Sequence, residues 1–559
     1  MHNNIIQTII ANIKIKLAIK KVSCICFILV TFSMSAQEKS WMYLRAIDTT
    51  FAPEFSKVGD HLVYNGNDTK FKNILQKYKI FEFKKTFKKA KKENLKKTFF
   101  VIADKEFILE DLLQSASHLF DSGELISPED KKIFEPNDYG LTSTIGANKG
   151  IQVNLDYYDF LKVPKAWYYT TGSHKSIVGI ADASVDTTNM EFKGKTTVFK
   201  ESPFSNGHGL GMAGIAAGQG DNGYGVPGVC YDCSIYTTDY GHFKDLNQLL
   251  ELSQAGAKVI NCSWVSSNYY QTAQDVINEM YNNGTIIVAA AGNLDWIKGK
   301  GEKLYYPASY DNVISVASLS YKHEKAKDNL LKTKKGDYYG ENIRGYLSRT
   351  LGFSDKENLT GGFNYPVSIT TLNPKVDLLA PSTGQFRYSK WMLEDEIEYI
   401  WQASSPTAPL VTGSIGLMYS LYPCLPTDEI ESILKLTTWN IDSIGDNKKY
   451  KGNYGAGALQ TGDAVEMVYQ MVAEDERVTI DNQNFSRWDF KLTTYSEKTI
   501  LKNQQFTDAA TLNLTSKNQI VLSENTVLKP NKEGNIHLKI NPSLQKECEL
   551  ELREGFPEN

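Results

Sequence analysis

Four separated stretches of the sequence carry the side chains that an acyl-transfer reaction needs. Asp182 follows the apolar run 177–181, His208 stands among glycines, Asn293 ends an Ala-Ala-Ala-Gly-Asn segment, and Ser405 is followed by a proline. A carboxylate can orient an imidazole, an imidazole can accept the proton of a hydroxyl, and an amide can donate to a developing oxyanion. Together these residue types indicate nucleophilic catalysis by a serine.

Each of these residues also has a simpler interpretation. Pro406 favours the first position of a helix, so Ser405 alone is predicted to be a helix cap. His208 is one of eight histidines, but it is in a glycine-framed segment before an apolar stretch of small residues. Asp186 is an alternative to Asp182, which we prefer because it directly follows the apolar run. The joint occurrence of the four side chains favours the catalytic interpretation.

The order and the surroundings of these residues resemble the subtilisin family of serine proteases, the subtilases. Residues 403–409, Ala-Ser-Ser-Pro-Thr-Ala-Pro, are similar to the family's Gly-Thr-Ser-Met-Ala-Ala-Pro, and residues 208–214, His-Gly-Leu-Gly-Met-Ala-Gly, are similar to His-Gly-Thr-His-Val-Ala-Gly. The resemblance spans residues 137–471. It implies a serine endopeptidase acting on polypeptides, in which Asp182 orients His208, His208 is the base, Ser405 is the nucleophile and Asn293 is the oxyanion donor.

The resemblance also places a peptide-binding strand at residues 261–266. The family's Asn-Met-Ser-Leu-Gly-Gly reads Asn-Cys-Ser-Trp-Val-Ser here, so Ser263, Trp264 and Val265 are predicted to contact the substrate. Val265 replaces a glycine of the family pattern, and we expect a narrowed pocket for the residue before the cut.

Departures from the family patterns gather close to the catalytic groups. They are Ala183, Leu210, Gly211 and Ala403. They keep an alternative open, namely a catalytically inactive subtilase-like binding or surface protein. A weaker possibility gives the main role to the C-terminal region, as an anchor or a carbohydrate reader.

The pattern between residues 137 and 471 predicts an α/β domain with a mostly parallel sheet and flanking helices. Apolar runs predict buried strands and amphipathic runs predict helices between them. The strands are expected at residues 176–181, 259–264, 285–291 and 313–317, and the helices at 246–255 and 274–282. Asp182 and Asn293 each come just after a strand, where such sheets bind ligands.

The region before this domain has two parts. Residues 1–36 combine lysines, a short apolar run and a small-residue cleavage site, which predicts a signal peptide and a secreted or cell-surface protein. Residues 41–130 are predicted to form a small α+β domain, and the resemblance implies a propeptide that assists folding and blocks the cleft. Eight lysines between residues 84 and 97 indicate a solvated face. Neither a nucleic-acid partner nor a transmembrane span is predicted.

The last region, residues 476–559, is predicted to be a small all-β domain, because short alternating runs are separated by Asn, Lys, Gly and Pro. Residues 320–361 interrupt the α/β pattern and are typical of a lid, a binding loop or disorder.

The cysteines and the cofactors leave open questions. Five cysteines follow the signal peptide, so at least one thiol is unpaired. Cys230 and Cys233 form a disulfide or remain two thiols, and Cys262 is predicted to be a buried apolar residue. No metal ligands stand out, although calcium sites are frequent in the family. The net charge of -4 indicates no particular partner.

Overall fold

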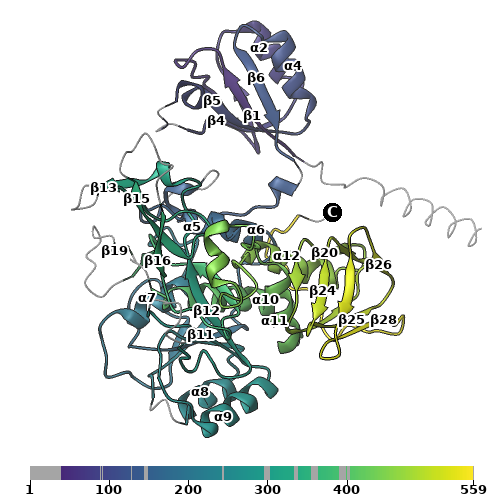
Figure 1. Cartoon of the computed structure of the whole chain (residues 1–559). Helices are drawn as coiled ribbons and strands as arrows, with labels where there is room; N and C mark the ends of the chain where they lie inside the picture. Colours follow the sequence, from purple (N-terminus) through teal and green to yellow (C-terminus); the bar gives the residue numbers. More distant parts are fainter. Residues whose placement is uncertain are drawn as a thin grey trace, which may run out of the picture. The chain divides into compact units, whose positions relative to one another are not determined.

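The structure is a computed structural model of the chain, shown in Figure 1. It describes residues 39–87, 90, 92–127, 129–143, 149–241, 245–294, 303–332, 338–353, 363–388, 398–399 and 403–557. The predicted signal peptide lies outside the described residues. The described residues form two compact units, one of residues 39–132 with 555–557 and one of residues 133–554.

The first unit is a six-stranded antiparallel sheet with two main helices on one face (Figure 1). The strand order is β2-β3-β4-β5-β1-β6, with β1 (Ser40–Ala46), β2 (Phe55–Val58), β3 (His61–Tyr64), β4 (Ile80–Lys85), β5 (Thr98–Ala103) and β6 (Phe120–Leu125). The helices are α2 (Thr69–Leu75) and α4 (Phe107–Ser115), and α3 (Glu93–Lys96) is a single turn. Alternate residues of β1 point inward and join one core with Phe71 and Leu112. The predicted α+β composition of this segment is therefore confirmed.

The second unit is built on a seven-stranded sheet in the order β17-β12-β11-β10-β7-β9-β8, in which all paired strands are parallel. Its strands are β7 (Ile177–Ala181), β8 (Thr196–Val198), β9 (Ser234–Thr238), β10 (Val259–Cys262), β11 (Ile286–Ala290), β12 (Val313–Leu319) and β17 (Leu378–Pro381). The central strands are buried along their length, which explains their continuous apolar runs. The predicted parallel α/β fold is confirmed.

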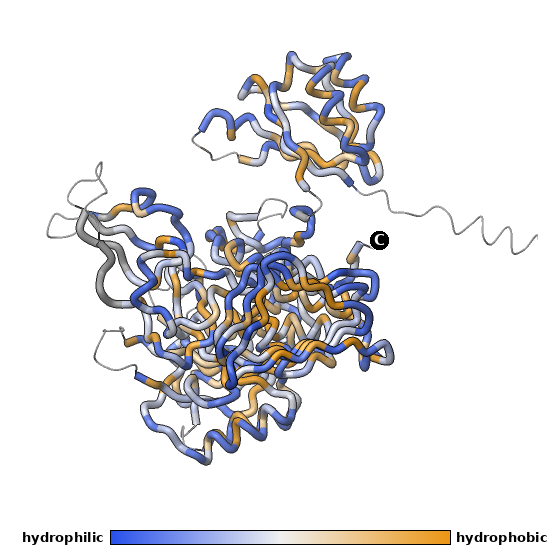
Figure 2. Tube along the Cα trace, turned by 45° about the vertical axis from the view of Figure 1, so that its right-hand side comes forward, coloured by the Kyte–Doolittle hydropathy of each residue, from blue (hydrophilic) through white to orange (hydrophobic). Residues whose placement is uncertain are grey.

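Helices cover both faces of this sheet. On one face, α8 (Asn247–Gln254) and α9 (Gln271–Asn282) pack over Ile260 and Ile287. The opposite face carries α7 (His208–Ala217) and α10 (Thr407–Leu421), and Gly416 of α10 approaches Val178. The other α-helices of this unit are α5 (Asp156–Phe160), α6 (Val163–Tyr169), α11 (Thr427–Leu436) and α12 (Thr461–Val472). Its 3₁₀ turns lie at Gly140–Thr142, Ala326–Asp328 and Gly445–Tyr450, and a further turn, Glu129–Lys131, precedes the unit. In Figure 2 the apolar segments run through the interior of each unit and the hydrophilic residues gather on outer loops.

The insertion within residues 320–361 is more ordered than the sequence suggests. Its described parts belong to a four-stranded antiparallel sheet of β13 (Leu330–Lys332), β14 (Tyr338–Gly340), β15 (Ser348–Phe353) and β16 (Phe363–Ser368). Of the three alternatives, a lid, a binding loop or disorder, the last is therefore wrong for these residues. A short pair, β18 (Phe386–Arg387) and β19 (Glu398–Tyr399), follows.

The C-terminal region is a parallel β-solenoid of three coils. Three parallel sheets, β20-β23-β26, β21-β24-β27 and β22-β25-β28, each take one strand from every coil. The strands are β20 (Arg477–Asp481), β21 (Asn484–Phe485), β22 (Asp489–Thr494), β23 (Lys498–Lys502), β24 (Gln505–Asp508), β25 (Thr511–Ser516), β26 (Ile520–Leu522), β27 (Val527–Pro530) and β28 (Asn535–Ile540). The predicted all-β character is confirmed, and the region belongs to the second compact unit.

Two disulfide bonds cross-link this unit. Cys230 pairs with Cys233, which resolves the open question, and Cys424 pairs with Cys548. The second bridge ties the chain after the solenoid to the end of α10, where Glu551 N also donates to Leu421 O. Cys262 is a free, buried thiol, as predicted. Within the part of the chain that the structure describes, no helix has the length and apolarity to cross a membrane.

Candidate active site

The predicted site residues come from one edge of the parallel sheet. Asp182 follows β7, Ser263 follows β10 and Asn293 comes shortly after β11, and these three strands are neighbours in the sheet. The carboxyl ends of parallel strands lie at the same edge, where ligands bind. The indole Nε1 of Trp264 donates to Ala181 O at 2.9 Å and joins the ends of β10 and β7. The predicted strand 259–264 ends at Cys262, so Ser263 and Trp264 belong to this edge.

Asp182 and His208 form a close pair. His208 Nδ1 lies 2.8 Å from Asp182 Oδ1, the Asp182 side chain is fully buried, and the His208 side chain is 24% exposed. With its proton on Nδ1, the imidazole donates to the carboxylate and leaves Nε2 as an acceptor toward the cleft. Asp186, the alternative carboxylate, instead accepts bonds from the backbone and the hydroxyl of Thr188.

Glycines allow His208 to approach the strand that carries Asp182. His208 is the first residue of α7, and Gly207 before it has φ 79°, a left-handed conformation that glycine adopts without strain. A Cβ on Gly209 would lie 1.9 Å from Ala183 O, so only glycine fits there. A Cβ on Gly211 would lie 3.1 Å from Tyr388 O, which leaves little room for the second histidine of the family pattern.

Ser405 lies just before α10 and is held by the end of β10. The helix begins at Thr407 with Pro406 as N-cap, one residue later than predicted. Ser263 Oγ donates to Ser405 O at 2.8 Å, and Ser405 Oγ donates to Ser263 O at 3.3 Å. The Ser405 hydroxyl is therefore in a long, weak bond, and among the described residues it makes no hydrogen bond to His208. Catalytic bonds are often loose in a substrate-free site and tighten in the complex.

Asn293 is anchored by its oxygen, which leaves its amino group as a donor. Ser404 donates to Asn293 Oδ1 twice, from its backbone N at 2.7 Å and from its Oγ at 2.9 Å. This assignment points Nδ2 away from Ser404, and the residue is exposed. Among the described residues, neither Asn293 Nδ2 nor Ser405 N–H has an acceptor. Two free donors beside a serine hydroxyl can stabilise an oxyanion.

A cavity of about 310 Å³ joins these groups. Ser405, Asn293, Ser263, Trp264 and Val265 all line it, together with Tyr305. Val265 is 41% exposed, whereas the indole of Trp264 is buried in the core cluster. The structure therefore brings Ser405, Asn293 and the predicted substrate-binding residues together around one hollow.

Two residues at this edge are absent from the sequence interpretation. Ser404 positions Asn293, and Tyr240 donates from its hydroxyl to Asp182 Oδ1 at 2.9 Å. Ser404 could have been noticed as a second hydroxyl beside the nucleophile. Tyr240 lies 58 residues from Asp182 along the chain, and no local pattern indicates their contact.

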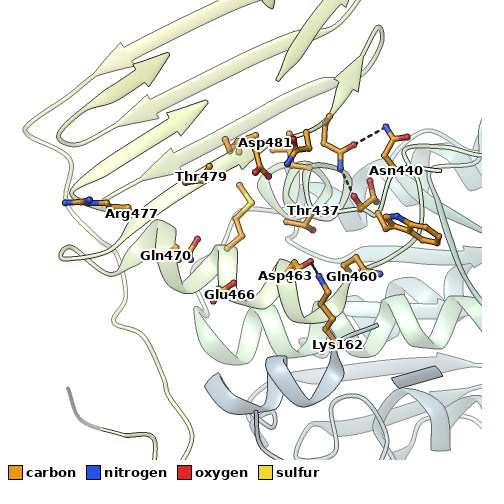
Figure 3. Close-up of a pocket in the computed structure, with 17 residues that line it drawn as sticks. Lys162, Thr437, Asn440, Gln460, Asp463, Glu466, Gln470, Arg477, Thr479 and Asp481 are labelled. Carbon is orange, nitrogen blue, oxygen red and sulfur yellow. Dashed lines mark hydrogen bonds and ion pairs between the residues drawn. The ribbon is translucent and has the colours of Figure 1, made fainter. Parts of the chain in front are cut away.

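A larger cavity lies elsewhere in the second unit, between α12, the loop after α11 and β20. Its volume is about 510 Å³, and none of Asp182, His208 or Ser405 lines it. Figure 3 shows Lys162, the residue before α6, directed at Asp463 of α12. Lys162 Nζ donates to Asp463 Oδ2 at 2.6 Å. Glu466 is paired with Lys165 at 2.5 Å. These two carboxylates are paired with lysines, a third carboxylate of the cavity is Asp481, and neither a histidine nor a serine is among the lining residues.

Comparison with known proteins assigns the chain to a family. The subtilase family model matches residues 139–459, more than half of the chain, so the chain belongs to the subtilase family. The resemblance in the sequence is thereby confirmed. One curated relative is the thermophilic serine proteinase of Bacillus sp. (strain AK1), 30% identical over 168 residues, which are 28% of this chain and 41% of that protein. Another is the calcium-dependent protease of Trichormus variabilis, 25% identical over 406 residues, which are 64% of this chain and 56% of that protein.

The matches are partial. They span less than two thirds of the length of these two relatives. Among solved structures, proteases from Pseudoalteromonas arctica PAMC 21717 align with a TM-score of 0.40 and 21% identity, over 55% of this chain and 94% of that chain.

Proposed function

We propose that this chain is a serine endopeptidase that hydrolyses peptide bonds with Asp182, His208 and Ser405. The observation that carries the proposal is the 2.8 Å contact between His208 Nδ1 and the fully buried carboxylate of Asp182. A buried carboxylate held against an imidazole fixes its tautomer and stabilises its charged form during attack.

In this mechanism the Ser405 hydroxyl leaves Ser263 O and turns toward His208 Nε2. Ser405 Oγ attacks the scissile carbonyl while His208 accepts its proton, and Asn293 Nδ2 and Ser405 N–H donate to the oxyanion. His208 then protonates the leaving amine, and a water molecule hydrolyses the acyl-enzyme by the same steps. Every catalytic side chain and backbone donor in these steps comes from this chain.

Labelling with a fluorophosphonate probe tests the proposal. The purified protein should be labelled at Ser405 and should cleave a denatured protein substrate, and Ser405→Ala should lose both properties. Ser543→Ala, at an exposed serine of the C-terminal tail, is the control and should behave like the unmodified protein. An unmodified protein that is folded, free of residues 41–130 and unreactive with the probe would contradict the proposal.

One observation favours the inactive alternative, a subtilase-like binding protein. Among the described residues the Ser405 hydroxyl donates to Ser263 O and has no bond to His208. The same labelling separates the two functions, because a serine that His208 never activates stays unlabelled.

We also propose that the protein is made as an exported precursor. Residues 1–36 would direct export, and residues 41–130, which have their own hydrophobic core, would act as an inhibitory propeptide. The boundary between the two compact units at Lys132–Ile133 falls in the polar stretch where we expect maturation, residues 127–137. N-terminal sequencing of the mature protein tests this point.

A structural calcium ion belongs to the same proposal, since one relative is named a calcium-dependent protease. The buried carboxyl groups of Glu191 and Asp138 do not fit such an ion, because burial raises the pKa of Glu191 to about 9 and both oxygens of Asp138 already accept from backbone N–H groups. Calcium takes six to eight oxygen ligands. In the described part of the chain no three acidic, histidine or cysteine side chains are grouped for a metal, so no residues are assigned to the ion.

A further inference from the structure

Three donors converge on a single oxygen of Asp182. Oδ1 accepts from Ala183 N at 2.6 Å, from Tyr240 Oη at 2.9 Å and from His208 Nδ1 at 2.8 Å. The other oxygen, Oδ2, is buried and has no hydrogen-bond partner among the described residues. The plane of this carboxylate is therefore set through Oδ1 alone. Only one of the three donors, Tyr240, is a side chain outside the proposed triad.

Tyr240 is firmly placed for this contact. It lies two residues after β9, the strand beside β7, and Asp182 N donates to Thr238 O at 3.0 Å. The backbone oxygen of Tyr240 accepts from Gln248 Nε2 at 2.7 Å. Its ring packs edge-on against Phe204, with 5.8 Å between the ring centroids. The loop that leads into His208 therefore touches the same tyrosine.

The hydroxyl of Tyr240 remains a donor under all ordinary conditions. Burial raises the pKa of Tyr240 well above its usual value, and the charge of Asp182 raises it further. Ala183, the residue after Asp182, carries no hydroxyl. Tyr240 supplies a hydroxyl near Asp182 from the segment after β9.

We propose that Tyr240 is a positioning residue of the active site, which orients the Asp182 carboxylate toward His208 through the bond from its hydroxyl to Oδ1. This inference rests on the proposed function. Tyr240 acts through Asp182 and takes no part in bond making. Without its hydroxyl, Ala183 N–H and His208 alone would hold a fully buried charge.

Other titratable groups near Asp182 do not replace this donor. Cys262 of β10 faces it as a thiol, since burial and the charge of Asp182 raise the pKa of Cys262 well above its usual value. His208 of α7 faces Oδ1. In the described residues, Asp182 has no ion pair with a lysine or an arginine.

Tyr240→Phe is the direct test, because it removes the hydroxyl and keeps the ring. We expect kcat to fall about tenfold, because a less well oriented carboxylate holds His208 less well for the attack by Ser405, with KM nearly unchanged. The acid limb of the profile of kcat/KM against pH should move to higher pH. When His208 is neutral, the charge of Asp182 is balanced only by hydrogen bonds, and the Tyr240 hydroxyl stabilises it most. When His208 is protonated, its own positive charge balances the carboxylate. Removal of the hydroxyl therefore favours protonated His208, which is the inactive form.

Tyr236→Phe is the matched control. Tyr236 lies on β9, and its ring packs against Phe199. Among the described residues its hydroxyl makes no hydrogen bond to Asp182. This variant should keep both kcat and the pH profile. Melting curves of both variants should show unchanged folding.

The outcomes separate this inference from the proposed function. An unmodified protein without labelling or hydrolysis contradicts the function itself. An active unmodified protein with a Tyr240→Phe variant of equal kcat and identical acid limb overturns only the role of Tyr240. A variant that raises KM alone also overturns it, because such a change indicates a contact with the substrate.

Discussion

Ser263 and Ser405 exchange hydrogen bonds across the cleft, each donating from its hydroxyl to the other's backbone oxygen. The bond from Ser263 Oγ to Ser405 O measures 2.8 Å and the reverse bond 3.3 Å. Asn261 Nδ2 donates to Ser263 Oγ at 2.9 Å and fixes the first partner. The shorter bond holds the backbone of the proposed nucleophile to the end of β10, whereas the longer bond retains its hydroxyl only weakly. The segment expected to bind the substrate is thus coupled to the residue expected to attack it.

Asn293→Ala should lower turnover strongly without abolishing it. Removal of a side-chain oxyanion donor costs about 10²- to 10³-fold in kcat, because the donor stabilises the transition state but makes no bond. Steady-state kinetics on a peptide substrate gives the measurement, with Asn268→Ala at an exposed position as the control. A change confined to KM would show that Asn293 binds the ground state instead.

Ser404→Ala extends this prediction to the residue that anchors Asn293. The variant loses the 2.9 Å bond from Ser404 Oγ to Asn293 Oδ1 and keeps the 2.7 Å bond from the backbone N. We expect a fall in kcat of about tenfold, smaller than for Asn293→Ala, since the amide remains present but less well held. A Ser404→Ala variant as impaired as Asn293→Ala would contradict this graded effect.

The parallel sheet and the edge that carries the site could be predicted, because each strand has a recognisable apolar run in the local sequence. The runs before Asp182 and Asn293 are apolar along their whole length, as expected for strands with helices on both faces. The contact between Tyr240 and Asp182 could not be predicted in this way. It depends on which strand lies beside β7, and the strand order is a property of the whole sheet.

The solenoid, too, could not be predicted from the local sequence. Each of its strands is two to six residues long and pairs with the strand three positions later in the chain, so local alternation indicates only an all-β region. Asn482, Asn503 and Asn525 recur once per coil with positive φ, and their side chains are joined by bonds of 3.5 and 3.0 Å. This recurrence is the signal in the sequence that a search for internal repeats would have found.

The segment of residues 41–130 should inhibit the mature protein when it is added as a separate polypeptide. It has its own core, which includes the fully buried Phe71, so it can fold independently of the second unit. Hydrolysis of a peptide substrate should fall as its concentration rises. Phe71→Ala, which removes a central core side chain, should lose inhibition together with folding. An intact, folded segment without effect at any concentration would contradict the propeptide role.

The stability of the second unit should depend on pH through Glu191. Burial raises the pKa of Glu191 to about 9, and a 2.6 Å hydrogen bond from Tyr388 Oη offsets this only in part. In the unfolded chain the carboxyl group of Glu191 ionises near pH 4.5. The stability that this site contributes is therefore fully present below that pH and is lost as the pH rises toward about 9. One such group lowers the free energy of unfolding by at most about 1.4 kcal/mol per pH unit.

Glu191→Gln should remove this dependence, because an amide does not ionise. In a Ser405→Ala background with a chelator present, its melting temperature should exceed that of the parent increasingly from pH 5 to pH 9. Glu533→Gln, at an exposed position, is the control. Equal melting curves for parent and Glu191→Gln at every pH would contradict a buried, neutral carboxyl group at this site.

Val265 should restrict the side chain that precedes the cut. It lines the cavity beside Ser405 and is 41% exposed, so its side chain occupies space that a glycine would leave open. We expect the protein to prefer small or medium residues at that position and to cleave poorly after Phe or Tyr. Val265→Gly should shift the preference toward aromatic residues by about 1 to 3 kcal/mol of discrimination. Profiling both forms on a peptide library measures the shift, with Leu294→Gly at the exposed rim of the same cavity as a comparison. If the unmodified protein already cleaves best after Phe or Tyr, Val265 does not form the wall of this pocket.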